Sequence, residues 1–529
     1  MVEISDQTAL LACPDADGRG DQDVGPRTST SSLDIGDSNR SRWPHFDRKH
    51  AASSLRERCV TVSVVICLML ICIVFIYTFV ARNSGSDLVC STVQKGYQCH
   101  QKYSQSWGQY SPFFSLQTIS EISPQVPIGC TVTFVQVLSR HGARYPTEKK
   151  FTIYSQLIKR IQARTETYRD DFAFLETFTY PLQSEDLTSF GVSQMIDSGI
   201  KFYRRYQHLT KESKLFVRAS GSPRVIVSAE KFIDGFHQEK LSDPSATDKS
   251  RKPSIGVIIS EELGSNNTLD HSNCILFEEA KPGLVAQAEF MEIFAPPILK
   301  RVNSHLIGAN LDITDIPYLM DLCSFHTVAI TPDASTISPI CTLFTDDEWT
   351  QYDYYNTLGK YYGHSTGNPL GASQGVGFVN ELIARLTNTP VTDSTTVNHT
   401  LDSNPQTFPQ GLSLYADFSH DNTMVSIFTA LGLFNGTEPL SNTTVRSPAE
   451  SKGFSAAWMV PFGARAYIEK MECDSTPVVR EPLVRVLVND RVVPLHGCKV
   501  DALGRCRLED FVEGLSYARG GGDRGKCFI

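Results

Sequence analysis

One uninterrupted apolar run stands apart in the pattern of hydrophobic and polar positions: residues 59–81, CVTVSVVICLMLICIVFIYTFVA, which hold no charged side chain. A helix of this length spans about 34 Å, enough to cross the hydrocarbon core of a bilayer. A buried core helix is the alternative, but soluble helices keep a polar face and this run has none. Because bulky Phe79 stands where a signal peptide needs a small residue, the run predicts an uncleaved transmembrane signal anchor.

Basic residues are distributed unequally around this run. Arg82 and Lys95 follow it, whereas six basic residues precede it: Arg40, Arg42, Arg48, Lys49, Arg56 and Arg58. Positive flanks stay in the cytosol, so we expect a single-pass type II membrane protein whose C-terminal part is lumenal or extracellular. Residues 1–58 are rich in Ser, Asp, Gly and Arg and are predicted to form a disordered cytosolic tail. Residues 82–89 would be a stem, where a protease could release the domain.

Two shorter apolar runs later in the chain predict buried strands that end at polar clusters. Val132–Leu138 is followed by Arg140-His141-Gly142-Ala143-Arg144, and Ser413–Phe418 is followed by Ser419-His420-Asp421-Asn422. After the second cluster, Met424–Leu433 has the apolar density of a helix. In an α/β fold, ligands bind outside the carboxyl ends of strands, so both clusters are placed for chemistry.

The first cluster has the side chains of a phosphate site. The guanidinium groups of Arg140 and Arg144 are planar forks that match pairs of phosphate oxygens, and His141 between them suits a nucleophile that attacks a phosphoryl group. Gly142 would let the backbone come close, and Pro146 begins a turn. The alternative, two arginines on an exposed loop beside an incidental histidine, fits the pentapeptide alone equally well.

The second cluster lies at a strand-to-helix junction. Backbone N–H groups and the helix dipole favour an anion there, to which His420 can donate, and Asp421 is a candidate proton donor for a leaving oxygen. Taken as an isolated dipeptide, it is better explained by a helix-capping Asp. A third segment, Phe216–Arg224, leads into a predicted helix, and the pattern does not decide which of Arg218 and Arg224 binds substrate.

Charge and cysteine content narrow the class of protein. The net charge is −9 and the pI near 5.8, so the chain lacks the positive potential that would attract nucleic acid, and the arginines must bind a small ligand.

Of 14 cysteines, ten lie beyond the apolar run. An even number in an oxidising compartment predicts five disulfides, whose connectivity the sequence leaves open. No Cys-x2-Cys pair or tight Cys/His cluster occurs, so we expect no metal. Four sequons predict N-glycosylation of a lumenal surface: Asn266, Asn398, Asn435 and Asn442.

Three motifs together carry a family resemblance. In this order and at these separations, Arg140-His141-Gly142-x-Arg144-x-Pro146, Arg218-Ala-Ser-Gly and His420-Asp421 resemble the histidine acid phosphatases, the branch of the histidine phosphatase superfamily that includes phytases. Further stretches are similar to the secreted fungal phytases, among them CSTVQKGYQC, WGQYSPFFSL, KYYGH, GNPLG, ELIARLTNTP and ALGLFNGTEPLS. The resemblance covers Cys90 to Phe528 and leaves out the tail and the anchor.

The resemblance implies a fold. It places in residues 90–529 an α/β domain with a central, mostly parallel sheet flanked by helices, and a smaller α-helical domain inserted roughly within 190–370. The active site would lie between the two. From the residues themselves, 483–488 and 491–495 around Asn489-Asp490 predict a hairpin added to the parallel core.

The resemblance also implies roles for site residues. His141 would be the nucleophile that forms a phosphohistidine, and Asp421 the acid that protonates the leaving alkoxide. Phosphate oxygens would be bound by Arg140, Arg144, Arg218 and His420. No cofactor is implied, and a carboxyl donor requires activity on the acid side of neutrality. The disulfide pairs implied are Cys90–Cys99, Cys130–Cys473, Cys274–Cys527, Cys323–Cys341 and Cys498–Cys506.

The substrate is less closely defined than the chemistry. Lys150 and Lys360 fall where phytases place lysines against the other phosphates of inositol hexakisphosphate, which favours a phytase acting as a monomer on a small phosphomonoester. Glu176 and Gly359, however, stand where fungal phytases often have lysine, which leaves a broad-specificity acid phosphatase as the alternative. A catalytically inactive protein that binds inositol phosphates is a third hypothesis.

Overall fold

The computed structural model describes residues 68–74, 89–180, 183–474 and 481–528. The chain divides into two compact units, Met1–Gly85 and Ser86–Ile529. In the first unit, residues 68–74 are helical and exposed; the rest of the predicted anchor 59–81, the tail, and the stem up to residue 88 lie outside the described residues. Within the described ranges, no helix is long and apolar enough to cross a bilayer.

The second unit is built on a single large sheet. Its strand order is β11-β10-β9-β3-β8-β5-β6, and β12 pairs with β10. Four strands run parallel to one another: β3 (Cys130–Arg140), β8 (Leu414–Ser419), β5 (Leu215–Ser220) and β6 (Ile255–Ile259). The others pair antiparallel: β9 (Arg465–Cys473), β10 (Leu483–Val488), β11 (Arg491–Val493) and β12 (Cys506–Arg507).

The sheet is therefore mixed, and the expectation of a mostly parallel sheet is wrong. Among the described strands of this sheet, three pairs are parallel and four are antiparallel. The parallel half arises because helices connect β5 to β6 and β8, whereas β10 and β11 are joined by the two-residue turn Asn489-Asp490, which forces a hairpin. That hairpin was predicted; the strand β9, which joins the two halves, was not.

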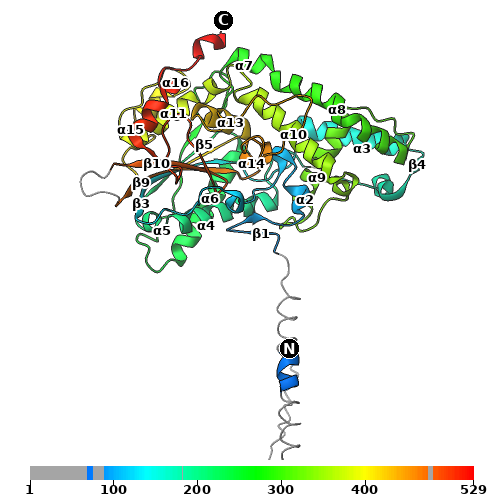
Figure 1. The fold of residues 1–529 in the computed structure, drawn as a ribbon, viewed down its shortest axis with the longest axis horizontal. Coiled ribbons are helices and arrows are strands. Elements are labelled where there is room, and N and C mark those ends of the chain that lie inside the picture. The colour runs from blue at the N-terminus through cyan, green and yellow to red at the C-terminus, as the bar shows by residue number, and fades with distance from the viewer. Residues whose placement is uncertain (1–67, 75–88, 181–182, 475–480, 529) are drawn as a thin grey trace, which may run out of the picture. The chain divides into compact units, whose positions relative to one another are not determined.

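Helices cover both faces of the sheet (Figure 1). Because side chains alternate along a strand, Val135 and Val137 of β3 point to one face, and Phe134 and Leu138 point to the other. The first face packs against α4 (Ser189–Arg205) and α6 (Pro223–Ser242), and the second against α11 (Val376–Thr387) and α13 (Asp421–Ala430). Every residue of β5 and β8 is buried, as expected for strands covered on both faces, and the two charged residues among them, Arg218 and Asp417, form an ion pair with each other.

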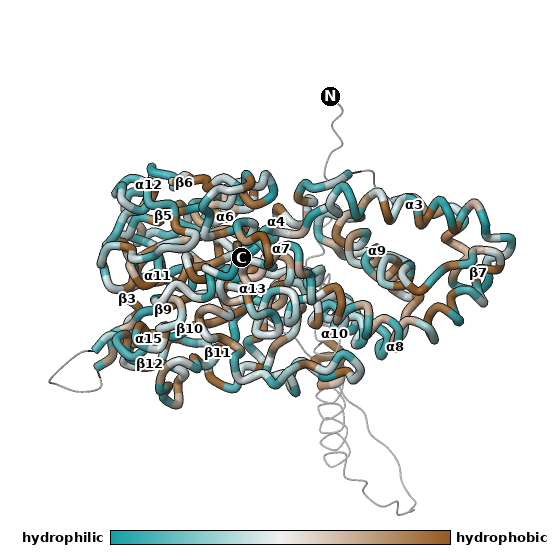
Figure 2. The backbone as a smooth tube through the Cα atoms, turned by 90° about the horizontal axis from the view of Figure 1, so that it is seen from above, coloured by the Kyte–Doolittle hydropathy of each residue, from teal (hydrophilic) through white to brown (hydrophobic). Residues whose placement is uncertain are grey.

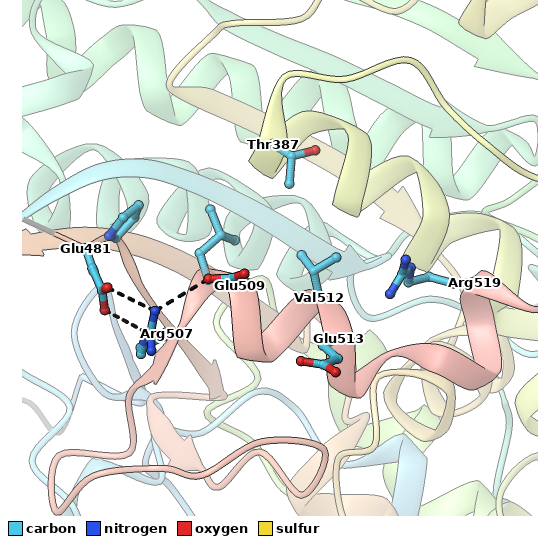
Figure 3. Close-up of a pocket in the computed structure, with 9 residues that line it drawn as sticks. Thr387, Glu481, Arg507, Glu509, Val512, Glu513 and Arg519 are labelled. Carbon is cyan, nitrogen blue, oxygen red and sulfur yellow. Dashed lines mark hydrogen bonds and ion pairs between the residues drawn. The ribbon is translucent and has the colours of Figure 1, made fainter.

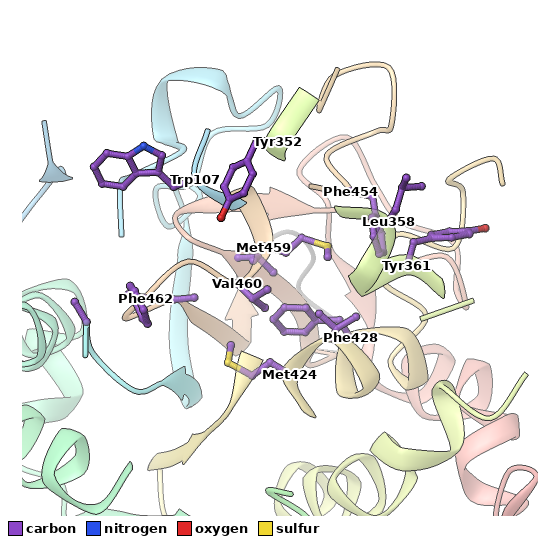
Figure 4. Close-up of a cluster of buried hydrophobic side chains, with 14 of the residues drawn as sticks. Trp107, Tyr352, Leu358, Tyr361, Met424, Phe428, Phe454, Met459, Val460 and Phe462 are labelled. Atoms are coloured by element: carbon purple, nitrogen blue, oxygen red, sulfur yellow. The ribbon is translucent and has the colours of Figure 1, made fainter. Parts of the chain in front are cut away.

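A second group of helices packs away from the sheet (Figure 2). It comprises α3 (Glu148–Arg164), α8 (Pro282–His305), α9 (Asp315–Ile330) and α10 (Asp346–His364). This differs from the range 190–370 expected for the helical part: α3 begins earlier, and α4 and α6, which lie inside that range, have their apolar sides against the sheet. A cluster of buried side chains joins α10 to the sheet, including Trp107, Tyr352, Phe428, Val460 and Phe462 (Figure 4).

Shorter elements complete the described fold. The short strands are β1 (Ser91–Thr92), β2 (Gly96–Tyr97), β4 (Thr167–Tyr168) and β7 (Leu306–Ile307). The short α-helices are α2 (Gln101–Ser104), α5 (Gln207–Thr210), α7 (Ile275–Ala280), α12 (His399–Asp402), α14 (Ala456–Met459), α15 (Leu508–Gly514) and α16 (Ser516–Arg519). The 3-10 turns are η1 (Gly108–Tyr110), η2 (Gln117–Ile119), η3 (Asp170–Glu176), η4 (Pro339–Leu343), η5 (Ala372–Gly375) and η6 (Arg524–Phe528).

Five disulfides cross-link the second unit and confirm the pairing that the resemblance implied. The pairs are Cys90–Cys99, Cys130–Cys473, Cys274–Cys527, Cys323–Cys341 and Cys498–Cys506. Two of them close loops of 343 and 253 residues. The first joins neighbouring positions on β3 and β9, and the second joins the start of α7 to the C-terminal turn η6.

Candidate active site

The two polar clusters meet at one edge of the sheet because β3 and β8 pair in parallel. Arg140, the last residue of β3, is the register partner of Ser419, the last residue of β8. The next residue, His420, is the N-cap of α13, and Asp421 is the first residue of that helix. The ring centroids of His141 and His420 are 5.8 Å apart. The parallel pairing thus builds one site from segments that are far apart in sequence.

Arg140 is fixed from several directions although it is almost fully buried, at 1% exposed. Its Nη1 donates to the carbonyl of Gln109 and, at 2.8 Å, to the carbonyl of Val460. Its guanidinium lies over the ring of Phe462, 4.6 Å from the centroid, and its Nη2 is 3.5 Å from Asp421 Oδ2. Burial lowers the pKa of Arg140 to about 10, against the attraction of Asp421, so it stays charged below neutrality.

His141 is oriented and held neutral. Its Nδ1 lies 2.9 Å from the carbonyl oxygen of Gly142, which can only accept, so Nδ1 carries the proton and Nε2 holds a lone pair. Burial first, and then the charges of Arg140, Arg144 and Arg224, hold the pKa of His141 well below its usual range. A buried, neutral imidazole with a free Nε2 is the state that a nitrogen nucleophile requires.

Gly142 fulfils the expectation of close backbone approach. A Cβ at this position would lie 2.5 Å from the carbonyl oxygen of Gly191 in α4, so no other residue fits without displacing the backbone. Its N–H donates to Ser228 Oγ of α6 at 3.1 Å. The segment that carries His141 is therefore packed directly against the two helices that cover the sheet.

Two further arginines, Arg144 and Arg224, lower the pKa of His141 through their charge. The Nη1 of Arg144 donates to the carbonyl of Tyr145 at 2.8 Å, and its guanidinium lies 6.0 Å from the ring centroid of Phe462. Arg224, in the first turn of α6, donates to Glu185 Oε2 at 2.8 Å, and its charge lowers the pKa of both His141 and Arg144. Of the two arginines in the Phe216–Arg224 segment, Arg224 is the one whose charge acts on His141.

Arg218 is enclosed in buried ion pairs, which argues against its predicted role in phosphate binding. It lies within β5, is 2% exposed, and donates from all three guanidinium nitrogens to Asp417 and Glu381, at 2.7 to 3.1 Å. Arg385 donates to the same Asp417 at 2.8 Å. A side chain in the middle of a strand points to a face of the sheet rather than to its end, so Arg218 is enclosed in an ion-pair network under α11.

Asp421 is ionised in this site. Lys360 Nζ donates to Asp421 Oδ2 and to Asn422 Oδ1, each at 2.6 Å. Burial opposes the charge of the carboxylate, but Arg140 and Lys360 outweigh it and hold the pKa of Asp421 well below its usual range. Asp421 can therefore donate a proton only after its pKa has risen. We expect this when a bound anion attracts Arg140 and Lys360 and so weakens their interaction with the carboxylate.

His420 is oriented by Glu261, which the sequence analysis did not single out. The Nε2 of His420 lies 2.8 Å from Glu261 Oε1, which also accepts from Ser220 Oγ and from the backbone N–H of Ser222. Burial raises the pKa of Glu261, but these donors lower it further, to about 2. Glu261 follows β6 at the same edge of the sheet, so its position at a strand end was the available signal.

The two lysines assigned to substrate differ in their surroundings. Lys150 Nζ donates to Asp321 Oδ2 at 2.9 Å and lies 4.7 Å from the ring centroid of Tyr318. Lys360 borders a pocket of about 320 Å³, whose lining also includes Gln109, His271, Lys281, Gly359 and Asn422. Lys281, which the sequence analysis missed, adds a cation beside Gly359. Glu176 is exposed on η3.

A larger hollow of about 700 Å³ lies near the C-terminus (Figure 3). It is bordered by Thr387 and by residues of the β12–α16 segment, and Arg507 forms an ion pair with Glu481 at 2.6 Å. None of the motif residues lines it. Among the described residues, no group of three or more His, Cys, Asp or Glu side chains could hold a metal ion.

Comparison with known proteins agrees with this geometry. The model of the histidine phosphatase superfamily (branch 2) matches residues 131–489. Phytase A of Aspergillus fumigatus is 57% identical over 448 residues, 85% of this chain and 96% of that protein; phytase A of Aspergillus awamori is 56% identical over 444 residues, 84% and 94%. The crystal structure of the phytase from D. castellii has a TM-score of 0.63 at 24% identity, covers 80% of this chain and 86% of that one, and thus shares the fold.

Proposed function

This chain belongs to branch 2 of the histidine phosphatase superfamily, and from that premise we propose that it hydrolyses phytate, myo-inositol hexakisphosphate, through a phosphohistidine intermediate. The observation that carries the proposal is the neutral His141: its Nδ1 is bound to the Gly142 carbonyl, which leaves Nε2 with a lone pair, its ring lies 5.8 Å from that of His420, and the charges of three arginines act on it. The fungal relatives named phytase A, at 57% and 56% identity, support phytate as the substrate.

In the first step, Arg140, Arg144, Arg224 and His420 bind the oxygens of the scissile phosphate. Positioned cations stabilise the charge that spreads over the phosphoryl group in the transition state. The lone pair on His141 Nε2 attacks phosphorus; the N–P bond forms as the P–O bond to the alcohol breaks, and the leaving oxygen takes a proton from the acid at Asp421.

The protonation of Asp421 follows from competition for cations. In the free site, Arg140 and Lys360 keep the carboxylate ionised. A bound phosphate group shares these cations and brings its own negative charge, which raises the pKa of Asp421 and favours its protonation in acid. In the second step, a water attacks phosphohistidine, the Asp421 carboxylate accepts its proton, the N–P bond breaks, and neutral His141 and inorganic phosphate result.

The range of substrates distinguishes the phytase from a second candidate function, a broad-specificity acid phosphatase. Lys360 and Lys281 border the pocket beside the site and suit further phosphate groups of a polyanionic substrate. Gly359 in the same pocket, the exposed Glu176, and the pairing of Lys150 with Asp321 reduce the cationic surface and favour a broad-specificity acid phosphatase. An inactive inositol-phosphate-binding protein is the third candidate, and the complete set of competent side chains argues against it.

We also propose that the enzyme is a monomer held by a type II membrane anchor at 59–81, with its catalytic domain lumenal or extracellular. The charge-free apolar run and the basic residues before it support this orientation. Five disulfides suit an oxidising compartment, and the sequon residues Asn266 and Asn435 are exposed while Asn398 and Asn442 are partly so.

Phosphate release from phytate and from p-nitrophenyl phosphate, measured at pH 5 with EDTA on the full chain in detergent, tests the proposal. We expect both to be cleaved, phytate with the higher kcat/KM, and the His141→Ala variant to be inactive on both. Equal kcat/KM values would favour the broad acid phosphatase. No release by folded wild-type protein would overturn the proposed activity.

A further inference from the structure

One face of α10 contacts the two segments whose backbone carbonyls bind Arg140, and the same face carries the lysine that binds Asp421. Asp353, Asn356, Thr357 and Lys360 recur at the spacing of a single helical face. Lys360 binds Asp421, as described above. The other three contact the segments that supply the backbone acceptors for Arg140.

Arg140 depends on two such segments. Its Nη1 donates to the carbonyl of Gln109 in η1 and to the carbonyl of Val460, which follows α14. The ring of Phe462, two residues later, lies under its guanidinium, and Val460 and Phe462 belong to the same buried cluster (Figure 4). The place of Arg140 is therefore set by how η1 and the 455–462 segment are held.

Asn356 and Thr357 each hold one of these segments. The side-chain amide of Gln109 donates to Asn356 Oδ1 at 3.0 Å, and the backbone N–H of Ala456 donates to Thr357 Oγ1 at 2.9 Å. A Cβ on Gly108 would lie 2.5 Å from the Cβ of Asn356, so η1 and α10 are in direct contact.

Asp353 completes the attachment of α14. Its Oδ2 accepts from Ser455 Oγ at 3.0 Å, and its Oδ1 accepts from the backbone N–H of Ala457 at 3.3 Å, so it caps a helix of another segment. It is 7% exposed and takes part in no ion pair in the described part of the chain. The mechanism proposed above gives this buried carboxyl no task.

We propose that Asp353 is a positioning residue of the phosphate site: by capping α14 it places the Val460 carbonyl and the Phe462 ring so that Arg140 is aligned with His141. This rests on the proposed function. The role is indirect, because Asp353 contacts neither Arg140 nor a substrate atom.

The state of Asp353 links this arrangement to acid conditions. Burial raises the pKa of Asp353 to about 7, against the hydrogen bonds from Ser455 and Ala457. Residues 453–462 carry no ionisable side chain. Elements η1, α2, α8 and α13 also pack against α10, and none of their titratable groups is among the influences on the pKa of Asp353, which are burial, Ser455 and Ala457. In acid the carboxyl is neutral; above about pH 7 it places an unpaired charge between α10 and α14.

The test compares Asp353→Ala, Asp353→Asn and, as a matched control, Asp347→Asn, which changes an exposed carboxyl on the same helix. On the full-length protein we would measure kcat and KM for p-nitrophenyl phosphate, the Kd of inorganic phosphate by calorimetry, the pH profile and the Tm. For Asp353→Ala, still folded at the assay temperature, we expect kcat/KM to fall about 10- to 100-fold and the Kd of phosphate to rise. Asp347→Asn should match wild type.

Asp353→Asn imitates the neutral carboxyl, so it should restore most of the activity and extend it to higher pH. A folded Asp353→Ala variant with wild-type kcat/KM, phosphate affinity and pH profile would overturn the proposal. If that variant does not fold, Ser455→Ala and Thr357→Val remove single contacts of the same attachment, and unchanged phosphate affinity in both would count equally against it. Phosphate affinity reports on Arg140 even if wild type cleaves neither substrate, so the two failures are distinguishable.

Discussion

Lys360 Nζ lies 2.6 Å from Asp421 Oδ2, so the proposed general acid is ion-paired before any substrate arrives. We predict that Lys360→Met raises the pKa of Asp421 in the free enzyme, because one of the two cations that lower it is lost. The pH at which kcat/KM for glycerol phosphate, whose alkoxide must be protonated, falls to half its maximum should therefore move upward. Lys300→Met, an exposed lysine of α8, serves as the control; equal pH profiles for both variants would contradict the predicted coupling.

Asp421→Asn should slow the enzyme according to the leaving group. An alkoxide needs a proton as it departs, whereas p-nitrophenolate departs without one, so we expect kcat to fall about 10²- to 10⁴-fold on glycerol phosphate and much less on p-nitrophenyl phosphate. Steady-state kinetics with both substrates measures the difference. An equal loss on both would show that Asp421 serves binding rather than proton transfer.

Arg224 and Arg218 make a matched pair of tests. Arg224→Gln removes a cation whose charge acts on His141, and we expect kcat/KM to fall about 10²- to 10³-fold with little change in the free energy of unfolding. Arg218→Gln leaves Asp417 and Glu381 buried with less compensation, and we expect the free energy of unfolding to fall by about 3 to 5 kcal/mol. Urea unfolding and kinetics per folded molecule separate the two effects. A loss of activity in Arg218→Gln and a loss of stability in Arg224→Gln would instead assign phosphate binding to Arg218.

These two arginines illustrate which parts of the site could be predicted from the sequence and which could not. Both polar clusters were found because they follow apolar strands, and the parallel register of β3 and β8 brings them together as expected. For the Phe216–Arg224 segment the sequence pattern left open which arginine binds substrate, and the family resemblance implied Arg218, which lies inside β5, whereas Arg224 lies beyond the end of that strand. The carbonyls of Gln109 and Val460, which accept hydrogen bonds from Arg140, could not be predicted from the sequence. Every residue has a backbone carbonyl, and only the fold determines its direction.

Glu261 should make the protein more stable above acid pH. Its pKa in the folded chain is about 2, below the ordinary value near 4.5, so its stabilising contribution is fully present above about pH 4.5 and is lost as the pH falls toward 2. Glu261→Gln should therefore lose less of its free energy of unfolding than wild type between pH 6 and pH 2.5. Urea unfolding at the two pH values measures this. A parallel decline in both proteins would assign the acid sensitivity to other carboxylates.

The disulfides should differ in what they contribute. Cys130–Cys473 closes a loop of 343 residues and Cys498–Cys506 one of 8, so the chain-entropy model predicts a larger loss for the double Ser variant of the first pair, within a range of about 2 to 5 kcal/mol. Urea unfolding under non-reducing conditions checks the order. Equal losses would mean that the cross-links act mainly on the folded state.

The parallel pairing of β3 with β8 also determines when the site can form during translation. His141 and Asp421 are 280 residues apart, and the strand that delivers one has no partner until the strand that delivers the other has been made. At roughly 5 to 20 residues per second, the ribosome needs about 14 to 56 s to cover that distance. Throughout that interval the nascent chain contains the proposed nucleophile without the proposed acid, so we expect no cleavage of phosphate esters until about four fifths of the chain has been translated.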